Sequence, residues 1–494
     1  MNLFFLKKLR ESISQNANNN AFCINDTFYF YSDLSDRIKI ISAILTSKKI
    51  INNRVGLVCG NNLDTYASII SCWFNGITFV PILETNPLER NFAILEEAQI
   101  KTILSPISLL DTDYKNKFDI LDINELHEDD NTALTIKNIQ DDSVAYILFT
   151  SGSTGKPKGV PISFKNLHEF LISFKKSGFN VGKDDRCLQM FELTFDVSIS
   201  SFLTSLLAGA CVYTASDKSH KYIDVFRIIN KYKLTSIQIV PSILKLGQTL
   251  LKRIDFSSVK TCILTGEATS IVELKNFQKV APHAVIFNYY GPTESTIYCS
   301  SFRIDNKVKE YNGMVSIGKP FDNNTFLLLN MEGEIINDNE KGELWISSQQ
   351  LTQGYLDKNL NEKSFCIINN QRYYKTGDLC FIDEEGDYLY CGRIDNQIQI
   401  QGFRVELGEI EFKAREKTGF NCVALDVTQN NFTEIILFIE VTRPIYSEEI
   451  RRILKEVLPH YMLPHIIIDL PTFPLTQSGK TDRVALKKLI SVKK

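Results

Sequence analysis

The sequence predicts an α/β fold of layered, largely parallel sheets that continues into a β-rich subdomain and a smaller α+β domain. Apolar, strand-like runs alternate with helix-like segments through the first three quarters of the chain, which is typical of α/β layers. Examples are the strand-like residues 54–59, the helix-like residues 63–74 and the strand-like residues 78–82. Residues 341–401 instead favour antiparallel strands. At 494 residues the chain is too long for one compact core, so we expect at least two domains.

Further elements follow from short apolar, β-prone runs. We expect strands at 144–149, 236–240 and 261–264. The polar or glycine-containing segments at 150–159, 265–268 and 291–294 each follow an apolar strand. In open parallel sheets ligands bind beyond the carboxyl ends of the strands, so these segments can converge on one site. Near the end of the chain, residues 407–411 predict the start of a helix and residues 432–441 predict a strand.

Composition and charge give no support to several classes of function. The net charge of −3 gives no electrostatic reason to expect a nucleic-acid partner or an anionic membrane surface. No apolar run is long enough to span a bilayer, so we expect no membrane insertion. The eleven cysteines are scattered without a C-x-x-C pair, which favours reduced thiols and a cytoplasmic protein over disulfides or zinc.

The segment after the strand at 144–149 has the chemistry of a phosphate-binding loop. Glycine allows backbone N–H groups to approach a ligand closely, and hydroxyl and ammonium groups suit phosphate oxygens. An ordinary surface turn is the structural alternative, but it does not require this density of such groups. The loop is not a Walker A sequence, because Thr150 and Pro157 stand where that motif needs other residues. Its residues are Thr150, Ser151, Gly152, Ser153, Thr154, Gly155, Lys156, Lys158 and Gly159.

With five further motifs the chain resembles the adenylate-forming enzymes, which include acyl- and aryl-CoA synthetases, luciferases and the adenylation domains of nonribosomal peptide synthetases. The motifs occur in the family's order at residues 265–268, 288–294, 374–378, 392–395 and 478–483. The resemblance implies a large N-terminal domain, residues 1–394, and a small mobile C-terminal domain, residues 395–494, with Asp395 as the hinge.

The resemblance also implies ATP and Mg²⁺ as cofactors and assigns residues to them. Phosphate-binding residues would be Thr150, Ser151, Gly152, Ser153, Thr154, Gly155 and Lys158. Residues near adenine and ribose would be Gly266, Glu267, Ala268, Asn288, Tyr289, Tyr290, Gly291, Asp378 and Arg393. Thr293 would contact the α-phosphate, and Glu294 would be the ligand of Mg²⁺. The structural alternatives are a helix-start carboxylate for Glu294, core packing for Tyr290, a turn for Asp378 and a surface ion pair for Arg393.

Lys480 is expected to be catalytic on the same basis. A lysine in a Ser-Gly-Lys turn near the end of a chain is otherwise an ordinary solvated side chain. In the family, the matching lysine bridges the substrate carboxylate and the α-phosphate as negative charge accumulates there. Thr293, Glu294 and Arg393 complete the expected catalytic set.

Asp196 points to an amino acid as the substrate. Amino-acid-activating members of the family carry an aspartate directly after phenylalanine, as in Phe195-Asp196 here, and it binds the α-ammonium group. A buried carboxylate needs such a cationic partner, although a helix cap is the structural alternative. The implied pocket, which suits a small or polar-tipped side chain such as that of glycine, alanine or serine, consists of Asp196, Val197, Ser200, Gln238, Ile263, Thr265, Tyr289, Ile297 and Tyr298.

The resemblance further implies transfer of the activated acyl group to a thiol. Gly402 would let the phosphopantetheine arm of an acyl or peptidyl carrier protein pass along bare backbone. Gln399 and Gln401 replace basic residues of the family's usual pattern, which weakens the expectation for the acceptor. Because the chain contains no carrier domain, we expect the carrier to act in trans. A D-alanine–carrier protein ligase and an acyl-CoA ligase for a simple carboxylic acid remain as alternatives, as does a non-enzymatic binding module.

Overall fold

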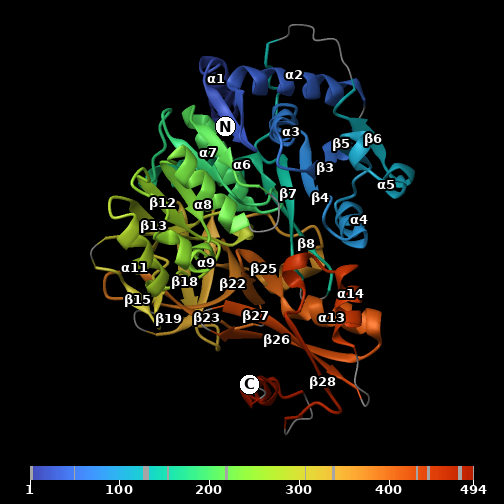
Figure 1. The fold of residues 1–494 in the computed structure, drawn as a ribbon, viewed down its shortest axis with the longest axis vertical. Coiled ribbons are helices and arrows are strands. Elements are labelled where there is room, and N and C mark those ends of the chain that lie inside the picture. The colour runs from blue at the N-terminus through green and yellow to red at the C-terminus, as the bar shows by residue number, and fades with distance from the viewer. Residues whose placement is uncertain are drawn as a thin grey trace. The chain divides into compact units, whose positions relative to one another are not determined.

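A computed structural model describes residues 4–48, 50–125, 133–152, 155–216, 221–305, 307–336, 340–395, 397–429, 432–441, 446–476 and 481–492. It confirms the predicted α/β class (Figure 1). By its internal contacts the chain divides into two compact units. The first comprises Met1–Glu84, Leu95–Phe149 and Gly159–Ile394, and the second comprises Thr85–Ile94, Thr150–Lys158 and Asp395–Lys494.

Among the described residues, the first unit contains a nine-stranded sheet whose middle strands are parallel. The edge strands β14, β17 and β2 pair antiparallel to their neighbours. The predicted strands at 236–240 and 261–264 are its neighbours β11 and β12. In sheet order the strands are β17 (Lys319–Pro320), β14 (Ser300–Ile304), β13 (Val285–Tyr290), β12 (Thr261–Leu264), β11 (Ser236–Ile239), β9 (Arg186–Gln189), β10 (Cys211–Thr214), β1 (Asn20–Ile24) and β2 (Thr27–Phe30).

A second sheet of six described strands confirms the predictions for residues 54–59, 78–82 and 144–149. The pairs from β6 through β5, β3 and β4 to β7 are parallel, which matches the alternation of strands and helices in this part of the sequence. The sheet order is β6 (Asp119–Asp122), β5 (Thr102–Ser105), β3 (Arg54–Cys59), β4 (Thr78–Leu83), β7 (Val144–Thr150) and β8 (Lys158–Ser163).

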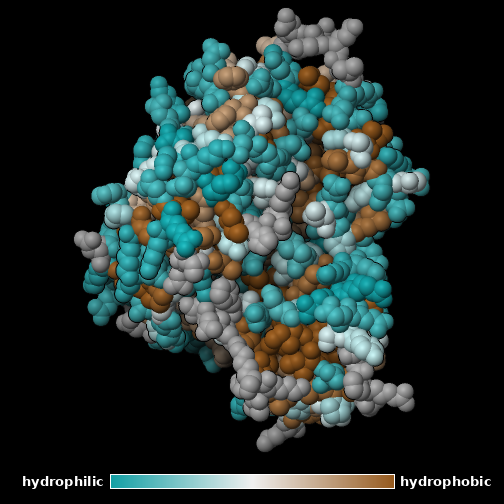
Figure 2. All heavy atoms as spheres, viewed as in Figure 1, coloured by the Kyte–Doolittle hydropathy of each residue, from teal (hydrophilic) through white to brown (hydrophobic). Residues whose placement is uncertain are grey.

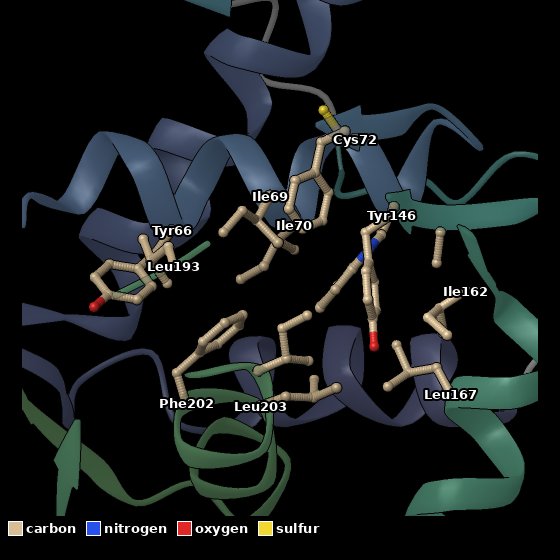
Figure 3. Packing of buried hydrophobic residues seen from close by; sticks show 14 of the residues in the cluster. Tyr66, Ile69, Ile70, Cys72, Tyr146, Ile162, Leu167, Leu193, Phe202 and Leu203 are labelled. Atoms are coloured by element: carbon tan, nitrogen blue, oxygen red, sulfur yellow. The ribbon is translucent and has the colours of Figure 1, made fainter. Parts of the chain in front are cut away.

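Helices of the first unit pack on these sheets and contribute to two separate hydrophobic clusters. The ring of Phe202 on α7 meets Tyr66 on α3 edge-to-face at 5.4 Å and stacks on Trp73 at 6.1 Å. Figure 3 shows Phe202 and Leu203 of α7 facing the side chains of α3. This packing fixes α7, whose first residue is Asp196. The helices are α1 (Phe4–Gln15), α2 (Tyr31–Ser47), α3 (Leu63–Phe74), α5 (Thr112–Lys117), α6 (Phe164–Lys176), α7 (Asp196–Ala208), α8 (Lys221–Tyr232), α9 (Pro241–Leu246), α10 (Gln248–Leu251), α11 (Ile271–Val280) and α12 (Asn361–Ser364), while α4 (Leu88–Glu97) belongs to both units.

The β-rich part of the first unit is antiparallel, as the sequence predicts. Strands β18 to β23 form one sheet in which Asp378 on β22 lies directly opposite Arg393 on β23. Its strands are β18 (Asn324–Leu329), β19 (Ile335–Ile336), β20 (Gly342–Ser348), β21 (Phe365–Ile368), β22 (Gln371–Ile382) and β23 (Tyr388–Arg393), and a small hairpin pairs β15 (Glu310–Tyr311) with β16 (Met314–Val315).

The second unit is an α+β arrangement with its own core. Apolar side chains of α13, α14 and the sheet β26-β27-β28 pack together, and Ile410, Leu437 and Leu454 are almost completely buried there. Figure 2 shows an apolar area over the same strands. The predicted helix start at 407–411 and the strand at 432–441 are both confirmed. The elements are β24 (Gln397–Ile400), β25 (Phe403–Glu406), α13 (Leu407–Thr418), β26 (Asn421–Gln429), β27 (Phe432–Glu440), α14 (Ser447–Lys455), β28 (Ile466–Leu470) and α15 (Arg483–Val492).

Candidate active site

Asp378, in the first unit, contacts two other residues that are expected to bind the nucleotide, Tyr290 and Arg393. The Tyr290 hydroxyl donates to Asp378 Oδ2 at 2.5 Å, and Arg393 Nη1 donates to Asp378 Oδ1 at 2.9 Å. The guanidinium offsets the cost of burying the carboxylate, which is only 6% exposed. Each carboxylate oxygen still has a lone pair available, so the pair of oxygens fits two neighbouring hydroxyl groups of a ligand.

Asn288 has a structural role in addition to the one expected for it. Its Oδ1 accepts from the Thr269 hydroxyl at 2.7 Å, and its Nδ2 donates to the carbonyl of Ser316 at 2.8 Å. The side chain therefore ties β13 to two neighbouring segments, and contact with an exocyclic amine would use the second lone pair of Oδ1. Glu267 Oε2 similarly accepts from the N–H of Ser242 at 2.9 Å, which fixes the segment that follows β12.

The segment from Gly291 to Cys299 folds back on itself under strain. A Cβ at Gly291 would lie 2.4 Å from the carbonyl oxygen of Ile297, so only glycine fits. A single 3-10 turn, Thr293–Ser295, is followed by two β-branched residues with positive φ, Thr296 at 60° and Ile297 at 73°. Such a conformation costs on the order of 1–3 kcal/mol per residue. It brings the Ile297 N–H to the carboxyl group of Asp196.

Asp196 is a buried carboxyl group without a cationic partner among the described residues. It is the first residue of α7, and Phe195 occupies the cap position, so the helix-cap alternative does not hold. Burial raises its pKa to about 6; nearby Glu294 acts in the same direction, while the Thr293 hydroxyl and the N–H of Val197 and Ile297 oppose the shift. No donor in the described part of the chain forms a hydrogen bond with Asp196 Oδ2. A cationic ligand would complete this environment.

Glu294 offers a second buried carboxylate beside Asp196. It is fully buried, and its Oε1 accepts a hydrogen bond from the Tyr355 hydroxyl at 2.6 Å. Among the described residues no group of three or more His, Cys, Asp or Glu side chains is arranged to hold a metal ion. A single carboxylate of this kind nevertheless fits Mg²⁺, which usually takes one or two protein carboxylates together with phosphate oxygens and water.

Four of the expected acyl-pocket residues, Ser200, Gln238, Thr265 and Tyr298, form one hydrogen-bonded network. Gln238 Oε1 accepts from the Tyr298 hydroxyl at 3.0 Å and from Ser200 Oγ at 3.3 Å. Thr265 also lies in hydrogen-bonding contact with Tyr298. The ring of Tyr289 meets that of Tyr298 edge-to-face at 5.2 Å.

The expected phosphate loop closes tightly within the second unit. The N–H of Gly155 donates to the carbonyl of Gly152 at 3.0 Å, and a Cβ at Gly152 would lie 1.9 Å from the carbonyl oxygen of Lys156. Lys158 lies 3.4 Å from a carboxylate oxygen of Glu406. Ser153 and Thr154 lie outside the described residues.

The two residues expected to act in thiol transfer and as the hinge, Gly402 and Asp395, lie in the Asp395–Lys494 segment of the second unit. Gln401 and Gly402, with φ of 51° and 84°, form the two-residue turn between β24 and β25. Positive φ at both positions is the geometry of a tight hairpin, which explains the glycine structurally. Asp395 accepts from the N–H of Gln397 at 3.1 Å. Lys480 lies outside the described residues.

Three residues of these sites carry no signal in the sequence. Tyr355 reaches Glu294 from a loop 61 positions away. Tyr146 is fully buried on β7, and Asp196 lies close enough to contribute to its raised pKa, which burial mainly causes. Arg90 on α4 pairs with Glu409, 319 positions away. Contacts at such separations depend on the fold, and no local pattern predicts them.

Comparison with known proteins identifies relatives over most of the chain. The model of the family described as AMP-binding enzyme matches residues 9–356. The chain is 30% identical over 468 aligned residues to gramicidin S synthase 2 of Aneurinibacillus migulanus. The alignment covers 92% of this chain and 10% of that protein. It is also 30% identical to delta-poly-L-ornithine synthetase of Acinetobacter baumannii (strain AB307-0294), over 92% of this chain and 34% of the relative. The chain therefore spans about a third or less of the length of these two curated relatives.

Solved structures share the fold. The Vibrio cholerae adenylation domain AlmE, in complex with glycyl-adenosine-5'-phosphate, superposes with a TM-score of 0.86 at 24% identity, covering 100% of this chain and 98% of that one. Holo-PA1221, a nonribosomal peptide synthetase protein with adenylation and carrier (PCP) domains, gives a TM-score of 0.84 at 21% identity, covering 98% of this chain and 84% of the other. Every helix in the described part of the chain is too short or too polar to cross a membrane.

Proposed function

We propose that this chain, which belongs to the AMP-binding enzyme family, activates a small α-amino acid as an aminoacyl-adenylate and releases pyrophosphate from ATP. The observation that carries the proposal is Asp196. Its Oδ2 accepts no hydrogen bond from the described residues. Burying such a carboxyl group costs free energy unless a cation pairs with it. An α-ammonium group is such a cation, and its carboxylate neighbour would be the group that reacts.

The proposed roles of the nucleotide-binding residues follow from their contacts. Asp378, held by hydrogen bonds from Tyr290 and Arg393, accepts hydrogen bonds from the ribose hydroxyls. Lys158 neutralises phosphate charge together with the hydroxyl and N–H groups of the loop, while Thr293 holds the α-phosphate. Mg²⁺ bound by Glu294 would supply a Lewis acid that offsets phosphate charge.

Formation of the adenylate then needs alignment and charge neutralisation. The carboxylate oxygen of the amino acid attacks the α-phosphorus, a P–O bond forms, and the bond to the pyrophosphate oxygen breaks. Asp196 binds the ammonium group of the amino acid, so the carboxylate of the amino acid is held in line with the α-phosphorus. Lys480 neutralises the negative charge that accumulates between the two reacting groups.

In the second proposed step the phosphopantetheine thiol of a carrier protein in trans attacks the acyl carbon of the adenylate. The thiol loses its proton, a C–S bond forms, the C–O bond to the phosphate breaks and AMP leaves. Gly402 would line the path of the pantetheine arm, and the segment from Asp395 onward would turn as a domain. The two-domain division at residue 394 is part of this proposal. The structure of PA1221, which joins an adenylation domain to a carrier domain, supports the pairing of such domains. The scattered cysteines favour the cytoplasm as the compartment.

Two alternatives share the first step, formation of an acyl-adenylate, but differ in substrate or in acceptor. D-alanine–carrier protein ligase would also use Asp196, so the enantiomer preference separates it from other amino-acid ligases. An acyl-CoA ligase for a simple carboxylic acid would leave Asp196 without a partner. Assays of AMP formation with coenzyme A and with a phosphopantetheine-bearing carrier as acceptors distinguish these possibilities.

Amino-acid-dependent ATP–pyrophosphate exchange tests the proposal directly. We expect exchange of radiolabelled pyrophosphate into ATP with one or a few small amino acids in a screen that includes D-alanine, and none with the corresponding acids that lack the amino group. The deaminated analogues are the matched controls for the Asp196 contact. Exchange that proceeds equally well with an analogue lacking the ammonium group contradicts the proposed substrate class.

Gln238→Ala is expected to broaden the substrate range. The amide of Gln238 fills space between Ser200 and Tyr298, so its removal makes room for a longer side chain. Discrimination against one added methylene, which is worth about 1–3 kcal/mol, should be reduced or lost. The measurement is the ratio of kcat/KM values for the preferred amino acid and its longer homologue. Both kcat/KM values come from one preparation, so a smaller fraction of folded protein lowers both equally and leaves their ratio unaffected. An unchanged ratio contradicts the assignment of Gln238 to the pocket.

A further inference from the structure

The loop Gln350–Tyr355, which follows β20 in the first unit, bonds to both the backbone and the side chain of Glu294. The N–H of Thr352 donates to the carbonyl of Glu294 at 2.8 Å, and the Tyr355 hydroxyl donates to Glu294 Oε1 at 2.6 Å. Glu294 and Thr352 are completely buried, and Tyr355 is only 5% exposed. The loop therefore fixes the position of Glu294 through its backbone and the orientation of its carboxylate through the hydroxyl group.

The same loop holds the strained backbone that follows Glu294. Gln350 Nε2 donates to the carbonyl of Ser295 at 3.3 Å and to that of Tyr298 at 2.9 Å. The hydroxyl of Thr296, which has a positive φ, donates to the backbone carbonyl of Gln350 at 2.5 Å. Gln350 is completely buried, so water does not compete for these bonds. They oppose relaxation of the strained turn and so keep Glu294 in one place.

The loop is itself supported by the neighbouring elements. Arg372 on β22 donates from Nη1 to the carbonyl of Thr352 at 2.6 Å, and its guanidinium lies 3.9 Å from the ring centre of Phe365. The N–H of Tyr355 donates to Asn361 Oδ1 at 2.8 Å, and the rings of Tyr355 and Phe365 lie 5.8 Å apart. A functional group is placed precisely only when the residues that orient it are held in this way.

We propose that Tyr355 is a positioning residue, whose hydroxyl group holds the Glu294 carboxylate in the orientation that binds Mg²⁺. This inference rests on the proposed function for the role of Glu294 as the metal ligand. A hydroxyl group is suited to the task, because it donates to one carboxylate oxygen without bringing a positive charge that would repel the cation. Core packing alone would be served equally well by phenylalanine, so the hydroxyl group carries the proposed role.

Tyr355→Phe should weaken the binding of a divalent cation to the complex of the full chain with ATP. The ring is kept and only the hydroxyl group is lost. We expect the dissociation constant of Mn²⁺, used as a paramagnetic substitute for Mg²⁺, to rise by about tenfold, as for other bonds that orient a metal ligand. The electron paramagnetic resonance signal of free Mn²⁺ measures this at a fixed ATP concentration. ATP in solution binds the same Mn²⁺ in every sample, so a difference between variants reports the protein.

The matched control is Tyr31→Phe, which removes the same group from another buried site of the first unit. The Tyr31 hydroxyl donates to the carbonyl of Ala210 at 2.8 Å, and the residue is completely buried. Its loss also removes one buried hydrogen bond, so stability should fall while Mn²⁺ affinity equals that of the wild type.

Two further variants separate positioning from a general loss of structure. In a Glu294→Gln background Tyr355→Phe should have no additional effect on Mn²⁺ affinity, because the hydroxyl group acts only through the carboxylate. If Tyr355→Phe does not fold, Asn361→Ala provides the test, since it removes the acceptor of the Tyr355 N–H from a partly exposed position. Mn²⁺ affinity should then fall in the same direction, and unchanged affinity contradicts the inference.

Equal Mn²⁺ affinity in the wild type and Tyr355→Phe overturns the inference, as does a loss that is equally large in Tyr31→Phe or that persists in the Glu294→Gln background. Mn²⁺ binding no greater than that of ATP alone in every protein sample also overturns it. The titration contains no amino acid, so its result is independent of the exchange screen. A protein inactive in that screen whose Tyr355→Phe variant binds Mn²⁺ more weakly would lose the proposed function and keep this inference.

Discussion

Lys480→Ala should reduce amino-acid-dependent ATP–pyrophosphate exchange by roughly two to three decades, the effect typical of a lost group that stabilises charge in the transition state. Both reactants of the first step are anionic, and the proposed substrate carboxylate approaches a triphosphate. A lysine placed between them acts where charge accumulates, so its removal affects kcat more than the KM of either substrate.

The transfer step provides the contrast for this prediction. When the aminoacyl-adenylate is supplied ready-made, Lys480→Ala should pass the acyl group to the thiol as fast as the wild type, because the α-phosphate chemistry is already complete. Lys488→Ala, which removes an exposed lysine from α15, is the matched control and should leave both steps unchanged. Exchange near the wild-type level in Lys480→Ala would remove this residue from the proposed mechanism.

The fold was predictable where periodicity is strong. The strand at 54–59 and the helix at 63–74 have the predicted bounds, because each is a continuous segment whose burial is set by its own apolar pattern. Contacts between distant segments are different. Nothing near Asp378 in the sequence indicates that its two oxygens meet Tyr290 and Arg393, since those bonds depend on the pairing of β22 with β23 and on the end of β13.

The candidate site shows the same division. The family resemblance identified Asp196, but its missing partner and its raised pKa follow from burial between segments that are far apart in the sequence. Glu409, which accepts from the N–H of Gly152 in the expected phosphate loop, and its partner Arg90 lie 319 positions apart and have no shared motif. Sequence patterns thus identify the residue types that chemistry requires, whereas charge pairing and strain, such as the positive φ of Ile297, require the folded chain.

Asp196→Asn is expected to lower activity and raise stability together. Breaking a buried pair of charges costs about 3–5 kcal/mol, so kcat/KM for the amino acid should fall by roughly two to four decades. Without substrate, however, the wild-type carboxylate is buried without a cation, and a neutral amide removes that cost. Pyrophosphate exchange and denaturant unfolding of the substrate-free protein measure the two effects, which should have opposite signs.

The dependence on pH identifies the cause of the stability gain. Because the pKa of Asp196 is about 6 in the folded protein against 3.8 as a reference, the folded state binds the proton more tightly than the unfolded state. This group therefore lowers the free energy of unfolding as pH rises from 3.8 to about 6, by a total on the order of 3 kcal/mol above that range. The advantage of Asp196→Asn over the wild type should be largest near neutral pH and vanish in acid.

Asp185→Asn supplies the control of opposite sign. Burial acts to raise the pKa of Asp185, but hydrogen bonds from the Gly182 N–H, the Thr235 hydroxyl and Lys260 outweigh it and lower the pKa. Its charged form therefore stabilises the fold, so the amide should be less stable than the wild type near neutral pH and approach it in acid. If Asp196→Asn behaves like Asp185→Asn, the carboxyl group of Asp196 already has the partner that we assign to the substrate, and an α-ammonium group has no place there.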